Sequence, residues 1–234
     1  MLHAGPSVAR FSWVALHVTP SLSGCGRPDH VAITFDDGPD PGSTPVFLDR
    51  LDAVGWKATF FMLGTMVRRS PSVARDVAAR GHEIAVHGDE HRSMLRRTPG
   101  STRDDIERAR DTIADACGVT PEWFRPPYGA LTLSSVLAAR SLGLRTVLWT
   151  AWGKDWRAEA TPESVTSDVL AGHFAGGTVL LHDADATSAP GSWRSALGAL
   201  DRLADAFAER GLVAGALRDH GVRGAGARSS RPAA

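Results

Sequence analysis

Two adjacent aspartates, Asp36 and Asp37, follow the apolar run Val31–Phe35. Neighbouring residues of a strand point to opposite faces, so such a pair brings two carboxylates to one place in different orientations. Carboxylates that lie this close do not both stay ionised at low cost unless a cation accompanies them. The pair therefore predicts either a metal ion or a fixed arginine nearby.

His87 and His91 form a second group with ligand chemistry. Two imidazoles four residues apart reach one metal ion if the segment between them makes a helical turn, and Asp37 would complete a three-ligand site. Two histidines and one carboxylate leave positions open for water and substrate, which is typical of a catalytic metal. The chain has nine histidines, so the spacing alone could arise by chance, and the interpretation depends on Asp37.

The segment Arg125–Gly129 supplies a candidate for the arginine that the aspartate pair requires. Its two prolines fix φ, and its guanidinium can clamp a carboxylate through two hydrogen bonds. The segment could also be no more than a rigid surface turn. Because Asp36 needs an oriented cationic partner, we expect Arg125 to bind it.

His182 ends the apolar run Thr178–His182, and Asp155 with Trp156 follows another such run. A lone histidine in this position is more often structural than catalytic. Beside a metal site, and with Asp155 to hold one ring nitrogen, His182 is better explained as a proton donor. Trp156 would suit the wall of a small apolar substrate pocket, although Trp152 and Trp156 could both be core or rim residues.

About seven apolar runs are predicted to be buried strands, and helical patterns separate them. The runs are Val31–Phe35, Ala58–Leu63, Glu83–His87, Trp123–Arg125, Thr146–Ala151, Thr178–His182 and Leu212–Leu217. Helices are expected at Thr44–Val54, from Ser70 to Gly81, from Ser101 to Gly118, after the N-cap Thr161, and at Ser192–Arg210.

Continuous apolar runs are typical of parallel strands that helices cover on both faces. The pattern predicts an α/β fold of about seven β-α units, either closed into a barrel or left as an open sheet. Parallel strands place their carboxyl ends on one rim, where α/β proteins build their sites. Every candidate residue named above lies at such a strand end, which is the main reason to assign them to one site.

Length and composition favour one large globular domain. We expect an irregular leader over residues 1–28, the domain over 29–219 and a disordered tail over 220–234. The 26 basic and 26 acidic side chains balance, so nothing predicts nucleic acid or an anionic membrane as a partner. No apolar run has the length of a transmembrane helix. Oligomeric state is not fixed, and a monomer is the default expectation.

The two cysteines, Cys25 and Cys117, lie far apart and are expected to be free thiols. The tetrapeptide Leu22–Cys25 resembles a bacterial lipoprotein cleavage box, but the apolar stretch before it is short and is interrupted by His17 and Pro20. No convincing signal peptide is identified, so the sequence does not fix the compartment and the cytoplasm is the default expectation. Anchoring to the cell envelope stays open as the alternative.

Five segments resemble, in the same order, the motifs of the polysaccharide deacetylases of the NodB-homology type, carbohydrate esterase family 4. They are Thr34–Gly38, His87–His91, Arg125–Gly129, Asp155–Trp156 and Leu181–His182. The resemblance spans residues 31–217, and the order of the five makes it more specific than any single motif. It implies a distorted, incomplete (β/α) barrel and a metal-dependent deacetylase that acts on acetylated sugars such as chitooligosaccharide or peptidoglycan.

The resemblance also implies a role for each matching residue. Asp37, His87 and His91 would hold a divalent metal, with zinc as the expected ion and cobalt or nickel as alternatives. Asp36 would be the general base, and Arg125 would orient it.

His182, braced by Asp155, would be the general acid that protonates the departing amine. Tyr128 would stabilise the oxyanion through its backbone N–H, and Trp156 and Leu181 would line the acetyl pocket. The residues expected to contact the substrate are Pro127, Tyr128, Trp156 and Leu181.

One position departs from the family pattern, because Gly88 stands where the second motif usually has Ser or Thr after its first histidine. The missing hydroxyl would have braced the ligand loop, so either the affinity for the metal is weaker or Asp89 substitutes for the hydroxyl. Three other functions remain open: an amidase on a non-sugar amide, a non-haem iron oxygenase, and a non-catalytic glycan-binding protein.

Overall fold

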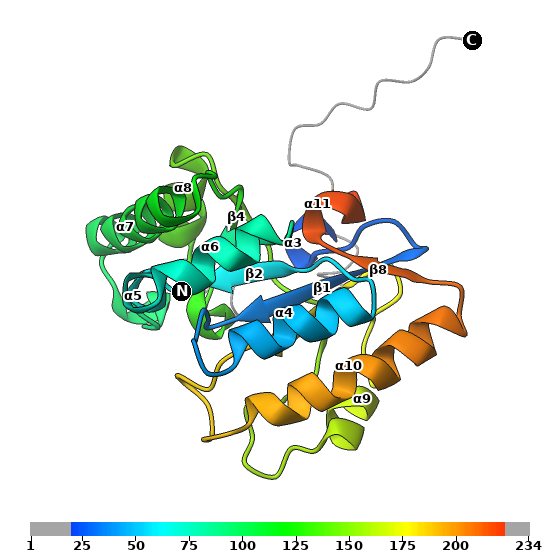
Figure 1. Cartoon of the computed structure of the whole chain (residues 1–234). Coiled ribbons are helices and arrows are strands. Elements are labelled where there is room, and N and C mark those ends of the chain that lie inside the picture. Colours follow the sequence, from blue (N-terminus) through cyan, green and yellow to red (C-terminus); the bar gives the residue numbers. More distant parts are fainter. Residues whose placement is uncertain (1–19, 223–234) are drawn as a thin grey trace, which may run out of the picture.

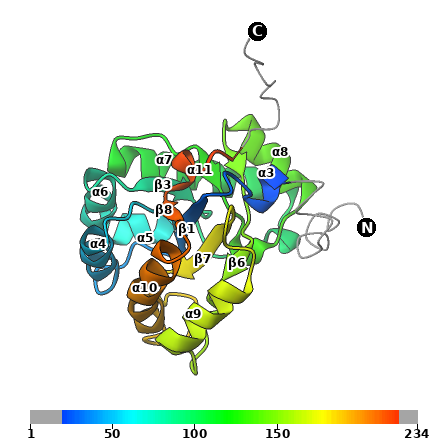
Figure 2. The same ribbon diagram turned by 90° about the vertical axis from the view of Figure 1, so that its right-hand side faces the viewer.

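Eight parallel strands form the centre of the fold, and helices surround them (Figures 1 and 2). The computed structural model describes residues 20–222. The strands are β1 (His30–Asp36), β2 (Thr59–Met62), β3 (Glu83–Val86), β4 (Trp123–Phe124), β5 (Arg145–Thr146), β6 (Ala151–Trp152), β7 (Thr178–His182) and β8 (Val213–Gly215). Their order is β5-β4-β3-β2-β1-β7-β6, with β8 paired to the first half of β1. This is the predicted α/β fold, an incomplete barrel.

Five helices begin and end close to the predicted residues. They are α4 (Thr44–Ala53), α6 (Pro71–Ala79), α7 (Pro99–Cys117), α9 (Pro162–Ala171) and α10 (Trp193–Ala208). The structure adds the unpredicted helices α3 (Pro20–Ser23), α5 (Gly64–Arg69), α8 (Leu133–Ser141) and α11 (Leu217–His220), with short 3-10 turns at Met94–Arg96 and Pro127–Gly129. Helix α7 starts earlier than Ser101 because Thr98 is its N-cap and accepts the Ser101 N–H. Helix α8, which the sequence analysis does not predict, starts with a capping box at Thr132.

The predicted strand Thr146–Ala151 is wrong, because the chain there forms two short strands that lie at opposite edges of the sheet. β5 pairs with β4 and β6 pairs with β7, so the residues between them cross from one edge to the other. Leu148 lies in this crossing, where its N–H donates to the Leu22 carbonyl and its carbonyl accepts from Arg125. An apolar run in the sequence indicates burial, but it does not indicate which groups form hydrogen bonds with the backbone.

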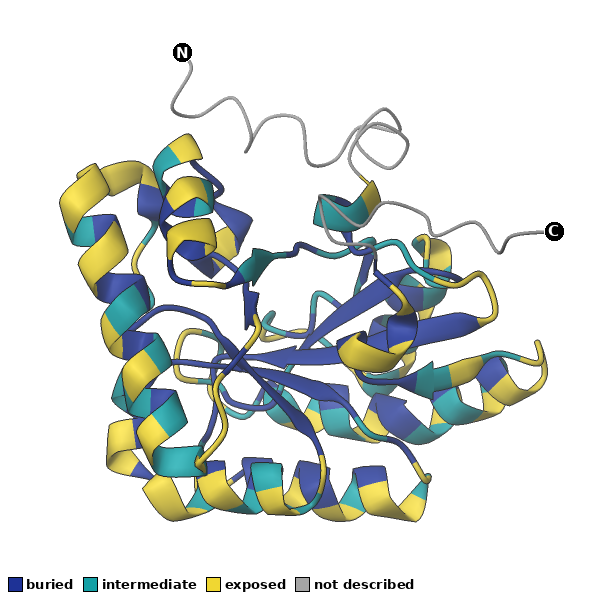
Figure 3. Ribbon diagram, turned by 90° about the horizontal axis from the view of Figure 1, so that it is seen from above, coloured by how far each residue is buried: buried dark blue, intermediate teal, exposed yellow. Residues whose placement is uncertain are grey.

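Alternating residues of the strands face two different cores. The larger core lies between the sheet and the helices and includes Ile33, Phe35 and Leu181. The smaller one lies inside the curled sheet and includes Ala32, Phe61, Ala85, Trp123 and Val147. Figure 3 shows the result, with strands buried along most of their length and helices exposed on their outer sides. The interior rows continue to the carboxyl ends of the strands, where they supply the side chains of the site.

The segment after Pro20, which we expected to be part of an irregular leader, packs against the described domain. Gly24 accepts a hydrogen bond from the Thr178 hydroxyl, and Cys25 is a half-buried free thiol. The expected leader over residues 1–28 and the expected tail over 220–234 otherwise lie mostly outside the described residues. Within residues 20–222, no helix is both long and apolar enough to cross a membrane.

Candidate active site

Asp36 and Asp37 reach the same interior space because the chain turns between them. Asp36 is the last residue of β1 and has the inward parity of Ala32 and Thr34. Asp37 comes after the strand, with φ of 79°, in the left-handed region that side chains other than glycine rarely adopt. Both carboxylates lie near His87 Nε2, with Asp36 Oδ2 at 3.6 Å and Asp37 Oδ1 at 3.4 Å. Strained backbone of this kind is concentrated at functional sites.

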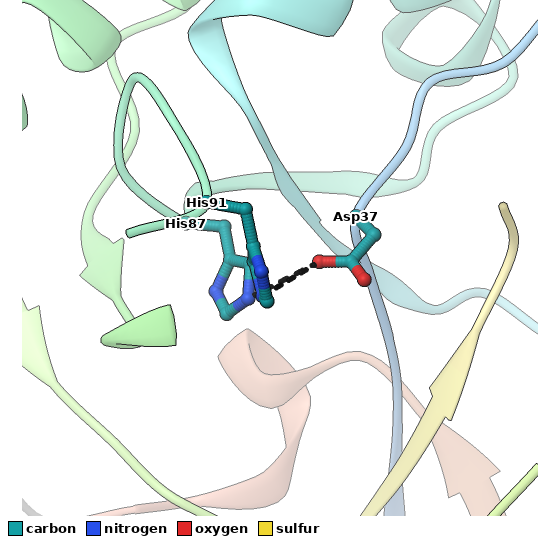
Figure 4. A group of neighbouring side chains, drawn as sticks. All are labelled: Asp37, His87 and His91. Atoms are coloured by element: carbon teal, nitrogen blue, oxygen red, sulfur yellow. Dashed lines mark ion pairs between the residues drawn. The ribbon is translucent and has the colours of Figure 1, made fainter. Parts of the chain in front are cut away.

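Asp37, His87 and His91 form a group of potential metal ligands (Figure 4). The Asp37 Oδ1 atom lies 3.4 Å from His87 Nε2 and 3.3 Å from His91 Nε2, and all three ligand atoms lie within 4.8 Å of one another. The buried Oδ1 atom accepts no hydrogen bond from residues 20–222. A buried acceptor without a donor is costly, and a divalent cation would satisfy it.

The ring of His87 is fixed in the orientation that a ligand needs. Its Nδ1 atom lies 2.9 Å from the Arg125 carbonyl oxygen, so Nδ1 carries the proton and Nε2 presents a lone pair toward Asp37. Burial lowers the pKa of His87 to about 3, and burial also lowers the pKa of His91. Both imidazoles are therefore neutral near pH 7, as metal coordination requires.

Arg125 is the cationic partner of Asp36, as the sequence predicts. Its side chain is completely buried, and Nη1 donates to Asp36 Oδ1 at 2.7 Å and to the Thr34 hydroxyl at 2.8 Å. The guanidinium also lies 4.0 Å from the centre of the Phe61 ring. Burial raises the pKa of Asp36, and Arg125 acts against that rise. A carboxylate with a raised pKa is a stronger base than an exposed one.

Asp155 holds His182 through two contacts. Its Oδ2 accepts the His182 backbone N–H at 2.7 Å, and its Oδ1 lies 3.0 Å from His182 Nδ1. Burial alone would lower the pKa of His182, but the negative charges of Asp155 and, to a smaller extent, Asp37 and Asp36 together outweigh it, and the pKa rises to about 10. His182 therefore carries a proton at neutral pH, with Nε2 directed away from Asp155.

These groups surround a cavity of about 290 Å³. Asp36, His87 and His91 lie on one side of it, and an aromatic wall of three indoles lies on another, in the order Trp149, Trp152 and Trp156. Trp156 also packs edge-on against His182, with the ring centres 5.8 Å apart. Tyr128 and Gly129 line the cavity, whereas Pro127 is buried behind them.

Leu181 is wrong as a pocket residue, because Leu180 lines the cavity in its place. Strand residues two apart share a face, so Leu180 has the same parity as His182 and points inward. Leu181 points outward and packs in the core beneath the helices.

Two features of the site were missed by the sequence analysis. Thr187, in the loop after β7, donates to Asp37 Oδ2 at 2.5 Å and so orients the ligand carboxylate. Trp149 lies in the crossing segment, so its place in the cavity depends on the split of the predicted strand. The sequence around Thr187 and Trp149 does not predict their place in the site, because each place depends on the path of a loop near the carboxyl ends of the strands.

The structure accounts for Gly88 by backbone conformation. Gly88 has φ of 96°, and a Cβ atom there would lie 2.9 Å from Oδ2 of the buried Asp105. Asp105, on α7, instead accepts the backbone N–H groups of Asp89 at 3.2 Å and Glu90 at 3.4 Å. The ligand loop is thus braced by a carboxylate from a neighbouring helix. The suggested substitute, Asp89, is turned away and is paired with Arg68.

Comparison with known proteins agrees with this geometry. A profile of the polysaccharide deacetylase family matches residues 23–147. The chain is 38% identical over 173 residues to a chitooligosaccharide deacetylase of Bradyrhizobium sp. (strain ANU 289), an alignment that covers 74% of this chain and 77% of that protein. It is 31% identical over 194 residues to a peptidoglycan-N-acetylglucosamine deacetylase of Bacillus cereus, and that alignment covers 82% of this chain and 68% of the relative.

Among solved structures, the fold is similar to that of the Bc1960 peptidoglycan N-acetylglucosamine deacetylase in complex with 4-naphthalen-1-yl-N-oxidanyl-benzamide. The TM-score is 0.80 at 25% sequence identity, over 91% of this chain and 98% of that one. The family match covers more than half of the sequence and includes the aspartate pair, both histidines and Arg125. The chain therefore belongs to the polysaccharide deacetylases, metal-dependent hydrolases that remove acetyl groups from sugars.

Proposed function

We propose that this chain removes the acetyl group from N-acetylglucosamine units of an oligosaccharide or polysaccharide, with zinc as its metal. The observation that carries the proposal is the convergence of an unsatisfied Asp37 carboxylate with two neutral histidines beside the Arg125–Asp36 pair. Two relatives, a chitooligosaccharide deacetylase and a peptidoglycan-N-acetylglucosamine deacetylase, support the substrate class.

Asp37, His87 and His91 are the residues that hold the metal. A neutral nitrogen pair with one carboxylate is a donor set that zinc accepts, and it leaves coordination positions for other ligands. When bound, the metal lowers the pKa of a coordinated water toward ~7 and polarises a carbonyl group. Thr187 keeps the Asp37 carboxylate oriented through its second oxygen.

Asp36 and His182 divide the proton transfers between them. Asp36 accepts the proton of the attacking water, and Arg125 keeps the carboxylate aimed into the cavity. His182 is protonated at neutral pH and donates to the amine nitrogen as the C–N bond breaks. Asp155 keeps the ring of His182 oriented, and before the next turnover Asp36 releases its proton to solvent and His182 takes one up. The products are acetate and a free amino sugar.

The aromatic wall receives the acetyl methyl group. Trp156 packs against His182, so an acyl group that contacts this indole places its amide nitrogen near the proton donor. Leu180 extends the apolar surface from the strand below. Tyr128, whose ring packs against that of His91, has φ of 59°, and its backbone N–H is assigned to the oxyanion.

A substrate panel tests this proposal. Acetate release is measured from chitooligosaccharides, peptidoglycan, acetylated xylan and a simple acetamide, each with zinc, cobalt or a chelator. We expect metal-dependent release from N-acetylglucosamine oligomers and none from Asp37→Ala. Release from the simple acetamide alone would indicate an amidase, and oxygen consumption with iron would indicate an oxygenase. Glycan binding without acetate release would reduce the chain to a binding protein.

A further inference from the structure

A second depression, of about 870 Å³, adjoins the catalytic cavity and shares His91 and Tyr128 with it. The rest of its lining comes from the segment after His91 and from the first turn of α7. We call it the basic groove, and its other lining residues are Arg92, Ser93, Leu95, Arg96, Arg97 and Ser101. A glycan that places one sugar at the catalytic cavity can extend into this groove, because the two spaces have a common wall.

Within the described residues, the lining of the basic groove includes three guanidiniums and no carboxylate, although the whole chain is neutral. The guanidiniums belong to Arg92, Arg96 and Arg97. Arg92 pairs with Glu90, and Arg97 pairs with Glu90 and Asp105. Local charge of one sign beside a cleft concentrates ligands of the opposite sign.

Of the three arginines that line the basic groove, Arg92 and Arg96 can bind a ligand, whereas Arg97 is fixed by an ion pair. Arg96 is exposed and forms no ion pair within residues 20–222. The side chain of Arg92 is 72% exposed, and its ion pair within the described residues is with Glu90. Because that pair is exposed to solvent, replacing Glu90 by a ligand carboxylate costs little free energy. The side chain of Arg97 is 15% exposed and pairs with Asp105 at 2.8 Å. Arg97 therefore adds positive charge to the groove, but its side chain is not free to move toward a ligand.

The start of α7 adds to the positive potential. Helix α7 has 19 residues and begins at Pro99, next to Ser101 of the groove. Its N-terminus carries the positive end of the helix dipole. Leu95, 43% exposed, offers an apolar contact on the same lining. The groove thus combines guanidiniums that bind a carboxylate in a bidentate manner with a small apolar surface.

We propose that the basic groove is a subsite for a carboxylate borne by the sugar next to the one that is deacetylated. This inference rests on the proposed function and narrows it, because it selects an anionic glycan over a neutral one. Arg96 and Arg92 bind the carboxylate, and Leu95 contacts the apolar part of its substituent. The groove touches the catalytic side chains only at His91 and Tyr128, so it sets substrate affinity and not the chemical step.

A matched pair of substrates tests the proposal. One is chitotetraose, and the other is a tetrasaccharide of alternating N-acetylglucosamine and N-acetylmuramic acid, which adds lactyl carboxylates to the same backbone. We expect the zinc-loaded protein to have a lower KM for the carboxylated substrate, and the advantage to shrink as sodium chloride rises to ~0.5 M. Arg96→Ala and Arg92→Ala should each raise that KM by ~5 to 10-fold.

The controls separate charge recognition from general damage. The same variants should raise the KM for chitotetraose much less than the KM for the carboxylated substrate, and Arg96→Glu should raise the KM for the carboxylated substrate further. Arg75→Ala, at an exposed arginine on α6 outside the groove, should change neither substrate. Equal KM values for the two substrates in the wild-type protein, or equal losses on both in the arginine variants, would overturn the inference.

Binding measurements distinguish this failure from failure of the proposed function. Calorimetry with the zinc-loaded Asp36→Asn variant compares the two tetrasaccharides without turnover. If the carboxylated glycan binds preferentially and through Arg96 but the wild-type protein releases no acetate, the carboxylate subsite is supported and the deacetylase function is refuted. If acetate is released with no preference between the two substrates, the deacetylase function is supported and the carboxylate subsite is refuted.

Discussion

Two pairs of largely buried histidines lie near opposite ends of β1, and they differ in what they face. At the carboxyl end, His87 and His91 both direct Nε2 toward the unsatisfied Asp37 carboxylate. At the amino end, His30 and His220 contact each other through Nδ1 at 2.9 Å, and His220 Nε2 lies 3.2 Å from the Gly24 carbonyl oxygen.

Both pairs have lowered pKa values, because burial disfavours the charged imidazole in each. Neutral, buried histidine is therefore not what distinguishes a metal site. The difference is the carboxylate: one pair converges on an acceptor that lacks a donor, and the other pair satisfies its own hydrogen bonds. The comparison predicts that changes at the two ends of β1 have different consequences.

Among replacements of residues that do not bind the metal, we expect Asp36→Asn to have the largest effect on activity. The variant loses the base but keeps the metal ligands, so kcat should fall by ~100-fold or more while zinc affinity stays close to that of the wild type. Acetate release and zinc titration measure the two quantities. An unchanged kcat would assign Asp36 another role.

Replacing Asp105 by Ala tests the brace of the ligand loop. The backbone N–H groups of Asp89 and Glu90 lose their acceptor, and zinc affinity should fall by ~10-fold, as is typical when a residue that supports a ligand is removed. Competition with a chelator measures the dissociation constant. A second variant, Gly88→Ser, should also weaken binding because of its positive φ. Wild-type zinc affinity in Asp105→Ala would show that α7 does not position the loop.

Replacing Asp155 by Asn shifts the pH dependence. The pKa of His182 is raised to about 10 chiefly because Asp155 opposes the effect of burial, so His182 stays protonated until the pH approaches that value. Without the carboxylate the pKa falls, and the alkaline limb of the kcat profile should move to lower pH by roughly one unit or more. An alkaline limb at the wild-type position would exclude His182 as the titrating acid.

Replacing His220 by Gln has the smallest effect on the site. His30 loses its imidazole partner at the amino end of β1, so the free energy of unfolding should fall by about 1 to 3 kcal/mol. Zinc stoichiometry and kcat should not change. Loss of zinc in this variant, measured under conditions in which it remains folded, would break the distinction between the two pairs.

The sequence predicts most of the site because the site depends on strand ends and on parity. Asp36, His87 and His182 each end or directly follow a strand whose limits are marked by apolar runs and glycines. The metal ligands and the Arg125 clamp follow from residue chemistry, since a buried carboxylate pair needs cations.

The errors arise where the local pattern does not determine the outcome. Leu180 and Leu181 are equally apolar, so hydrophobicity does not decide which one faces the cavity, whereas the face that Leu180 shares with His182 does. Thr146–Ala151 reads as one strand because both of its halves are apolar, although the halves pair at opposite edges. Thr187 and Asp105 act on the ligands from elements distant in sequence, and only the folded chain brings them there.

A zinc titration decides whether catalysis depends on a metal held by Asp37, His87 and His91. Protein stripped with a chelator is titrated with zinc while acetate release from chitotetraose is followed, for the wild type, His91→Ala and His220→Gln. We predict that activity of the wild type and of His220→Gln rises from zero and saturates at one zinc per chain, and that His91→Ala gains neither tight zinc nor activity. Acetate release by the stripped wild type, or by His91→Ala without bound zinc, would contradict the account.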